Sequence, residues 1–335
     1  WRLGQWRPWL CSKPDVVIAS STSPLDIYAA RRIERRHGAQ LVWEVHDLWP
    51  LSPIELGGMS PRHPFIMLLQ RAENVACRDA DVVVSMLPKA DEHLREHGMA
   101  AGKFIPVPNG IDPTEWIDDG AVHLPLAHAR VVAQARADGH LLVAYAGAHG
   151  VANALDSMLD AAALMRDEPV TWLLVGGGPE KAALQARVAA ERLVNVRMLD
   201  PVPKAAIPAL LRAMDVLYIG LQREPLFRFG ISPNKLMDYM MAAKPVLCAI
   251  DAGNDPVSDA GCGLTIEPEN SQALADAMRQ FVALDMPSRE RMGRNGRGYA
   301  EAHHVYPVLA QRFLSVMLSG TAKGAVLNRK ERPML

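Results

Sequence analysis

Residues 141–178 read LLVAYAGAHGVANALDSMLDAAALMRDEPVTWLLVGGG, and this stretch decides the fold class. It opens with an apolar run over 141–147, passes a turn and a helical pattern of Leu, Met and Ala, and closes with a second apolar run over 171–178. Apolar runs without alternation are typical of strands that are buried on both faces of a parallel sheet. The stretch therefore predicts a strand, a helix and a second, parallel strand.

The same alternation continues outward from this unit in both directions. Further strands are expected at 15–20, 41–47, 81–86 and 104–109 before it, and at 195–202, 216–221, 245–250 and 263–268 after it. Helices are expected between them, notably at 26–37 and 63–77. This order predicts an α/β protein with two Rossmann-like, doubly wound domains, of which the first is incomplete. We place the first domain at 1–125, the second at 126–306, a last helix at 307–320 and a tail at 321–335.

The composition is that of an ordinary globular protein. The 335 residues are 49% hydrophobic, and 36 basic against 37 acidic residues give a net charge of −1. A chain so close to neutrality lacks the basic field of a nucleic-acid-binding protein, and no apolar run is long enough to span a membrane. The four cysteines, Cys11, Cys77, Cys248 and Cys262, form no CxxC pair. We therefore expect neither a zinc site nor a disulfide framework, and a reducing compartment, the cytoplasm.

Glycines follow two of the expected strands. Gly147 and Gly150 come after the strand at 141–147, and three glycines at 176–178 come after the next. Turns at such places can aim backbone N–H groups at a phosphate. Neither turn has the GxGxxG spacing, which disfavours a dinucleotide dehydrogenase. Tight turns without a ligand are the alternative.

The segment SPNKLMD at 232–238 is the sharpest local signal. Ser232 is expected as the N-cap of a helix and Pro233 as its first residue. The helix N-terminus and Lys235 together would hold a diphosphate. Asp238, one turn further on the same face, would suit the vicinal diol of a ribose. A capped helix with a Lys–Asp surface pair is the alternative.

Other charged residues also follow expected strands. Arg223 and Arg228 follow one strand, and Lys204 follows another. Because ligands bind at the carboxyl ends of parallel strands, these cations are candidates for the same diphosphate; solvated surface charges are the alternative. His46 and Asp47 end a further strand, where a histidine can orient or deprotonate a hydroxyl. A hydrogen-bonded structural histidine is the alternative there.

A surface that suits an anionic, lipid-linked acceptor is expected in the first domain. The apolar run FIMLL at 65–69 is flanked by Arg62, His63 and Arg71, and a basic helix face carries Arg31, Arg32, Arg35 and Arg36. Apolar and basic side chains together favour contact with anionic lipid. Core packing of the apolar run is the alternative.

Four motifs in this order resemble retaining glycosyltransferases of family 4, which have the GT-B fold. They are EVHDLWP at 44–50, VPNGID at 107–112, GGGP at 176–179 and SPNKLMDYMMAAKPV at 232–246. The resemblance covers most of residues 14–318 and points to bacterial O-antigen and capsule enzymes of the fucosaminyltransferase type. It implies two facing domains with an interdomain cleft and a last helix that crosses back to the first. The donor would bind mainly to the second domain and the acceptor mainly to the first.

The family pattern also implies roles for residues. The carboxylate that binds the ribose falls on Asp238, and a second family glutamate falls on Gly230, which has no side chain to replace it. The catalytic pair is expected to be His46 and Asp47. The expected donor-binding residues are Gly147, His149, Gly150, Gly177, Lys204, Arg228, Ser232, Asn234, Lys235 and Asp238, and the expected acceptor-side residues are Asn109 and Gly110.

The resemblance implies retaining transfer of a sugar from a nucleotide-diphosphate sugar, with a UDP-sugar favoured. The acceptor would be a lipid-linked glycan in bacterial surface polysaccharide synthesis, met at the inner face of the membrane. We expect front-face substitution in which the diphosphate takes the acceptor proton, without a cofactor, a metal or a nucleic-acid partner. A nucleotide-sugar 2-epimerase of the same fold and a non-catalytic glycan- or nucleotide-binding subunit are the alternatives.

The chain begins at Trp1, without the strand and glycine-rich loop that open the first domain in the family. We therefore expect an N-terminally truncated form of an enzyme of about 400 residues. Transfer is expected of the full gene product, and nucleotide binding of the chain as it stands.

Overall fold

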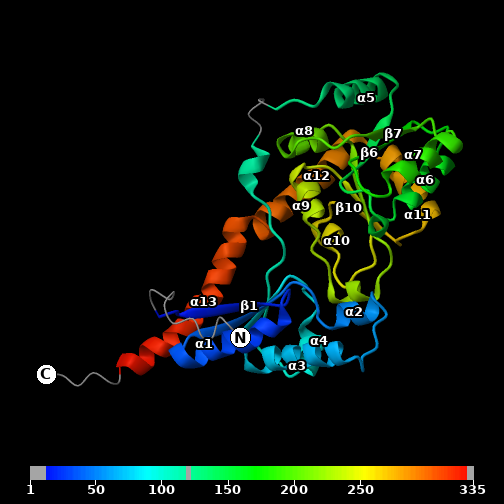
Figure 1. Ribbon diagram of the computed structural model, residues 1–335. Helices are drawn as coiled ribbons and strands as arrows, with labels where there is room; N and C mark the ends of the chain where they lie inside the picture. Colours follow the sequence, from blue (N-terminus) through cyan, green and yellow to red (C-terminus); the bar gives the residue numbers. More distant parts are fainter. Residues whose placement is uncertain (1–12, 118–121, 330–335) are drawn as a thin grey trace. The chain divides into compact units, whose positions relative to one another are not determined.

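The computed structural model describes residues 13–117 and 122–329, with side chains described as far as residue 317 (Figure 1). The chain divides into two compact units. Unit 1 comprises Trp1–Asn109, Pro225–Ser232 and Pro307–Leu335, and unit 2 comprises Gly110–Glu224 and Pro233–Tyr306.

Unit 1 contains a parallel sheet with the strand order β1-β2-β3-β4. Its strands are β1 (Val16–Ser20), β2 (Gln40–Val45), β3 (Val82–Ser85) and β4 (Phe104–Pro106). Its helices are α1 (Ile27–His37), α2 (Leu51–Glu55), α3 (Pro64–Asp79), α4 (Asp91–Glu96), the 3-10 helices η2 (Pro24–Asp26) and η6 (Pro225–Phe229), and α13 (Tyr306–Arg329) from its second residue on. Helices α1 and α3 contact each other and β2, and Figure 1 shows them side by side.

The core of unit 1 lies between the sheet and these two helices. Leu41, Trp43 and Val45 of β2 are buried there with Ala76 of α3. The ring of Phe229, from the short segment that joins unit 1 late in the chain, packs against the same core. Burial of apolar surface therefore holds that segment in unit 1.

Unit 2 contains a parallel six-stranded sheet with the order β10-β9-β8-β5-β6-β7. Its strands are β5 (Leu141–Ala146), β6 (Val170–Val175), β7 (Val196–Leu199), β8 (Val216–Gly220), β9 (Val246–Ala249) and β10 (Gly263–Ile266). Its helices are α5 (Leu126–Ala137), α6 (Leu155–Leu164), α7 (Lys181–Ala190), α8 (Ile207–Arg212), α9 (Asn234–Met241), α10 (Pro256–Ala260), α11 (Ser271–Ala283) and α12 (Met286–His303), with the 3-10 helices η3 (Pro113–Trp116), η4 (Val151–Asn153) and η5 (Lys204–Ala206). Helix α6 contacts α11, and α9 contacts α12.

The strand order of unit 2 reverses next to β5. From β5 the chain first builds β6 and β7 outward on one side, and then returns to add β8, β9 and β10 on the other. In open parallel sheets, ligands bind in the crevice outside the carboxyl ends of the strands at such a reversal. The turn that begins at Gly147, directly after β5, lies at this place.

Each of the ten expected strands is present within the described residues, although some end earlier than expected. The strand expected at 171–178 ends at Val175, because Gly176 and Gly178 turn the chain with φ of 151° and 150°. The strand expected at 195–202 ends at Leu199, shortly before Pro201. Proline lacks the N–H that a strand interior needs.

Helix α13 continues to Arg329, past the end expected at residue 320. The segment TAKGAVLNR at 321–329 is rich in strong helix formers, and its glycine costs only about 1 kcal/mol relative to alanine. The rest of the expected tail, 330–335, lies outside the described residues. Across the described ranges, no helix has both the length and the apolar character needed to cross a membrane.

Two unit boundaries differ from the domain boundaries expected from the sequence. Residues 110–125, expected in the first domain, belong to unit 2. There Ile111 N donates to His304 O at 2.8 Å, and Tyr306 N donates to Ile111 O at 3.0 Å. The segment Pro225–Ser232, expected in the second domain, belongs to unit 1.

Candidate functional site

Two glycine turns of unit 2 meet at the strand-order reversal. A Cβ on Gly176 would lie 1.9 Å from the carbonyl oxygen of Gly147, and one on Gly178 would lie 2.5 Å from that of His149. In addition, His149 N donates to Gly177 O at 2.8 Å. The turns after β5 and β6 are thus in direct backbone contact, which residues with a Cβ would prevent.

Lys235 of α9 reaches into the first of these turns. Its Nζ donates to the Tyr145 hydroxyl at 2.7 Å and lies 4.0 Å from the centroid of that ring. Asn153 Oδ1 lies 3.4 Å from the same Nζ. A Cβ on Gly147 would come within 2.7 Å of Lys235 Cε, so the glycine makes room for the lysine. Burial lowers the pKa of Lys235 to about 8, so the side chain is still mostly a cation at pH 7.

His149 holds the turn through its backbone while its ring is enclosed. The side chain is fully buried, and no hydrogen-bond partner for either ring nitrogen occurs in the described part of the chain. Burial lowers the pKa of His149, and the charges of Lys181 and Lys235 lower it further. The ring is therefore neutral at pH 7. Gly150 follows it and leads into η4.

Asp238 lines a cavity of about 890 Å³ whose wall includes Glu115, Trp116 and Lys204. Burial raises the pKa of Asp238 to about 6; the Glu115 carboxylate adds to the rise and the Lys204 ammonium opposes it. The exposed Lys204 is ion-paired with Glu115. Asp238 lies one turn after Lys235 on α9 and shares its face. Asp238 and Lys204 therefore share this cavity, and α9 connects it to Lys235 and the glycine turn.

Ser232 is not the helix N-cap expected from the sequence. Helix α9 begins at Asn234, and Pro233 stands at its N-cap position. The Ser232 hydroxyl instead accepts from Asn109 N at 2.8 Å, and Ser232 O accepts from Asn109 Nδ2 at 2.6 Å. A residue expected on the donor side and one expected on the acceptor side are thus joined within unit 1. Gly110 is the first residue of unit 2, and the Asn234 side chain is exposed.

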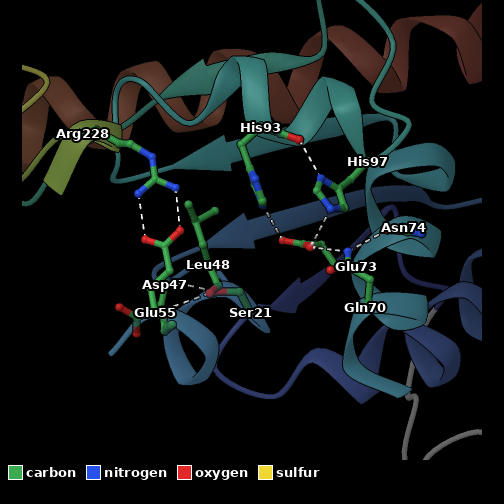
Figure 2. Close-up of polar contacts among 11 residues, drawn as sticks. Ser21, Asp47, Leu48, Glu55, Gln70, Glu73, Asn74, His93, His97 and Arg228 are labelled. Atoms are coloured by element: carbon green, nitrogen blue, oxygen red, sulfur yellow. Dashed lines mark hydrogen bonds and ion pairs between the residues drawn. The ribbon is translucent and has the colours of Figure 1, made fainter. Parts of the chain in front are cut away.

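Arg228, expected at the diphosphate, is engaged by a carboxylate of unit 1. Its Nη1 and Nη2 donate to the two oxygens of Glu55, both at 2.7 Å (Figure 2). Its guanidinium also stacks over Phe229, 4.2 Å from the ring centroid. Arg228 lowers the pKa of Glu55 through this hydrogen bond. No local pattern predicts this pairing, because Glu55 lies in a separate helix, far away in the chain.

His46 and Asp47 follow β2 at its carboxyl end, as expected. Their backbone N–H groups donate to the Ser21 hydroxyl at 2.9 and 3.2 Å, which fixes the turn after the strand. His46 Nε2 lies 3.3 Å from Glu44 Oε2, and its side chain is 40% exposed. Figure 2 shows Asp47 and Ser21 at this turn. Both side chains are accessible to a ligand of unit 1.

Sequence reasoning missed three residues that shape these places: Tyr145, Glu115 and Ser21. Tyr145 carried a usable signal, because it places a hydroxyl at the carboxyl end of an otherwise apolar strand. The sequence around Glu115 and Ser21 contains no comparable signal. They act through partners that only the tertiary structure supplies.

Comparison with known families matches both parts of the chain. Residues 140–283 match the family described as "Glycosyl transferases group 1", and residues 1–110 match the "Glycosyl transferase 4-like domain". The chain belongs to the family 4 glycosyltransferases of the GT-B fold. This confirms the family that the four sequence motifs indicated.

Similar proteins agree with this assignment. The glycosyltransferase is 25% identical to a protein of Escherichia coli K12 named for colanic acid biosynthesis, the glycosyl transferase WcaI, over 86% of this chain and 70% of the relative. The structure of Anabaena HepE in complex with UDP matches with a TM-score of 0.68 and 20% identity, over 91% of this chain and 79% of HepE. That of WaaG, a glycosyltransferase involved in lipopolysaccharide biosynthesis, matches with a TM-score of 0.59 and 17% identity, over 85% and 80%.

Proposed function

We propose that this glycosyltransferase transfers a sugar from a UDP-sugar to a lipid-linked glycan in bacterial surface polysaccharide synthesis. The observation that carries the proposal is the pairing on α9. One face of this helix offers a half-buried cation at Lys235, beside a glycine turn, and a half-buried carboxylate at Asp238, in a cavity. A nucleoside diphosphate has the matching order of groups, because its diphosphate is followed by the vicinal diol of the ribose.

The donor would be held by charge and by backbone N–H groups. Lys235 and the N-terminus of α9 would bind the diphosphate, and Asp238 would accept from both ribose hydroxyls. Few other partners compete for Lys235, since its contacts are the neutral Tyr145 and Asn153. The titles of the HepE structures name UDP and UDP-glucose, which supports uridine as the base.

The reaction would be a front-face substitution with retention. The acceptor oxygen forms a bond to the anomeric carbon on the face from which the diphosphate oxygen departs, and the acceptor proton passes to that oxygen. The Lys235 cation would stabilise the negative charge that develops on the leaving group. His46 and Asp47 are the groups we propose to orient the acceptor hydroxyl.

Polysaccharide synthesis is favoured by the names of the relatives, since WcaI is named for colanic acid and WaaG for lipopolysaccharide. We propose that the acceptor is bound to lipid, and unit 1 carries an exposed apolar surface that would suit a membrane. Phe65, Met67 and Leu68 at the start of α3 are 44%, 59% and 46% exposed, and Arg62 and Arg71 lie exposed nearby in the chain. Ile66 and Leu69 of the same run are buried, so the run serves both the core and the surface. We propose contact with the cytoplasmic face of the membrane.

Calorimetric titration of the protein with UDP, GDP, ADP and their sugars tests the donor site. We expect UDP ligands to bind tightest. Hydrogen bonds to a charged group contribute about 1.5–3 kcal/mol, so Asp238→Asn should weaken binding by about 10- to 150-fold. Lys235→Met should weaken it at least as much.

Two matched variants serve as controls for this titration. Asp276→Asn removes an exposed carboxylate of α11, and Lys244→Met removes a second half-buried lysine whose pKa burial also lowers. Both should bind UDP as the wild type does. Wild-type affinity in Asp238→Asn and Lys235→Met would refute the assignment of α9.

Transfer from a radiolabelled UDP-sugar to a membrane extract distinguishes the three functions considered. A transferase places label on lipid, an epimerase returns altered free sugar nucleotide, and a non-catalytic subunit binds without turnover. We expect label on lipid that is lost in Asp238→Asn.

A further inference from the structure

A buried cluster of metal-binding side chains lies in unit 1, away from Lys235 and Asp238 of unit 2. Glu73 of α3 and His93 of α4 are 2% and 8% exposed, and His97 directly follows α4 (Figure 2). One ligand atom from each of the three lies within 4.8 Å of the other two. The spacing of the histidines, four residues apart, places them on one side of the helix.

The distances between these atoms fit a small metal ion. Glu73 Oε1 lies 3.3 Å from His93 Nε2, and Glu73 Oε2 lies 3.8 Å from His97 Nε2. In a tetrahedral zinc site with bonds of 2.0–2.2 Å, ligand atoms are about 3.3–3.6 Å apart. The carboxylate and the imidazoles therefore need only small side-chain rotations to share one ion.

The hydrogen bonds around the cluster prepare its ligands. His97 Nδ1 lies 2.8 Å from the carbonyl oxygen of His93. Because a carbonyl can only accept, Nδ1 carries a proton in this contact, and Nε2 is the ring nitrogen that faces the carboxylate. Gln70 Nε2 donates to Glu73 Oε2 at 2.8 Å and to Asn74 Oδ1 at 2.9 Å, which holds the carboxylate in place.

We propose that Glu73, His93 and His97 form a binding site for a divalent transition metal, with zinc as the preferred ion. Two imidazoles and one carboxylate are a known zinc ligand set, whereas magnesium and calcium prefer oxygen ligands alone. Ion binding displaces any proton on His93 Nε2 to solvent. The side chain of His97 is 22% exposed, so water can reach the site and complete the coordination. The absence of CxxC pairs does not bear on this site, because it uses no cysteine.

The ion would stabilise the part of unit 1 against which the segment Pro225–Ser232 packs. The ring of His93 packs against that of Phe229, with the centroids 5.3 Å apart. The same segment is held by Glu55 through Arg228. An ion that joins α3 to α4 would therefore fix the surface on which η6 rests. Its role would be structural and independent of the nucleotide.

Zinc binding to the full chain, purified without a histidine tag and treated with a chelator, tests the proposal. Calorimetry should give one zinc ion per chain, and added zinc should raise the melting temperature. Cobalt should bind at the same site and give the visible absorption of a tetrahedral complex. Glu73→Gln, His93→Gln and His97→Gln should each abolish saturable binding. Gln70→Leu, which removes only the support of the carboxylate, should weaken it by about 10- to 100-fold.

His303→Gln, which removes an exposed histidine of unit 2, is the matched control and should bind zinc as the wild type does. His97 is the most exposed of the three ligands, so its substitution should disturb the core least. A loss of zinc binding in His97→Gln can therefore be attributed to the missing ligand and not to misfolding. Circular dichroism should show each variant folded without metal. Absence of saturable one-to-one binding in the wild type would overturn the proposal, and so would wild-type affinity in His97→Gln.

Discussion

Lys235 and Asp238 are charged residues kept where their charge is costly. Burial lowers the pKa of Lys235 from 10.5 to about 8 and raises that of Asp238 from 3.8 to about 6. Each pKa unit corresponds to about 1.4 kcal/mol. The cost of burying the lysine charge therefore lowers the free energy of unfolding, and this cost is complete below about pH 8. The cost of burying the aspartate charge does the same and is complete above about pH 6. At neutral pH both penalties apply, which is typical of groups retained for a ligand.

These two shifts predict how donor affinity depends on pH. Asp238 must be ionised to accept from both ribose hydroxyls, and Lys235 must be protonated to bind the diphosphate. Affinity for a UDP-sugar should therefore be highest between about pH 6 and pH 8 and fall on both sides. Titration calorimetry from about pH 5 to 9.5 measures this, because the diphosphate of a UDP-sugar does not itself titrate in that range.

The two limbs of the profile have separate controls. Asp238→Asn should flatten the acid limb and leave the alkaline one, and Lys235→Met should do the reverse. An unchanged profile in both variants would mean that other groups govern binding.

At the residue scale, the sequence predicted the placement of some residues better than their partners. The helix start and the i, i+3 spacing predicted that Lys235 and Asp238 lie one turn apart near the start of a helix, which the structure confirms, and their binding of the donor stays a prediction. Ser232 was assigned wrongly as an N-cap, because its hydroxyl is taken by Asn109, which lies far away in the chain. Arg228 likewise has a partner, Glu55, that no local pattern reveals. Hydrogen bonds between distant segments depend on the tertiary fold.

At the element scale, the backbone at Gly230 suits the glycine that stands where the resemblance implied a second glutamate. Gly230 ends the turn of η6 with φ of 95°, and its N–H donates to Phe227 O at 2.9 Å. A side chain at such a left-handed φ costs about 1–2 kcal/mol. The backbone of this segment thus favours glycine at the position where the resemblance implied a carboxylate.

Restoring that carboxylate should therefore harm the protein. We expect Gly230→Glu to lower the free energy of unfolding by about 1–2 kcal/mol without tightening donor binding. Denaturant unfolding and calorimetry measure both quantities. Gly298→Glu, at an exposed helical glycine with open space, is the control and should be neutral or stabilising. A stable Gly230→Glu variant with tighter sugar binding would contradict this account.

Also at this scale, the parallel strands were predictable because they are buried apolar runs separated by glycine and proline. Their ends were less so, since β6 and β7 each stop three residues before the expected end, next to Gly176 and shortly before Pro201. The extent of α13 was underestimated for the opposite reason. Its basic, glycine-containing end has no strong helix breaker.

At the scale of the whole molecule, the proposed membrane contact can be measured directly. Phe65→Ser combined with Leu68→Ser should reduce cosedimentation with anionic vesicles by about tenfold or more, since each exposed apolar side chain contributes on the order of 1 kcal/mol or more when inserted. Neutral vesicles should bind the wild type more weakly, because they offer no negative charge that would attract Arg62 and Arg71. Leu126→Ser with Val194→Ser, at exposed apolar positions of unit 2, should bind as the wild type does. Equal binding by both double variants would count against this surface.

The discontinuity of unit 1 has a consequence for how the protein is made. Phe229 packs against its core, and its last segment begins at Pro307, after all of unit 2 has been synthesised. The buried members of that core all lie between Ala19 and Met99, so the core can begin to form before unit 2 is made. The two later segments can join it only after they have been synthesised, so unit 1 is completed after unit 2.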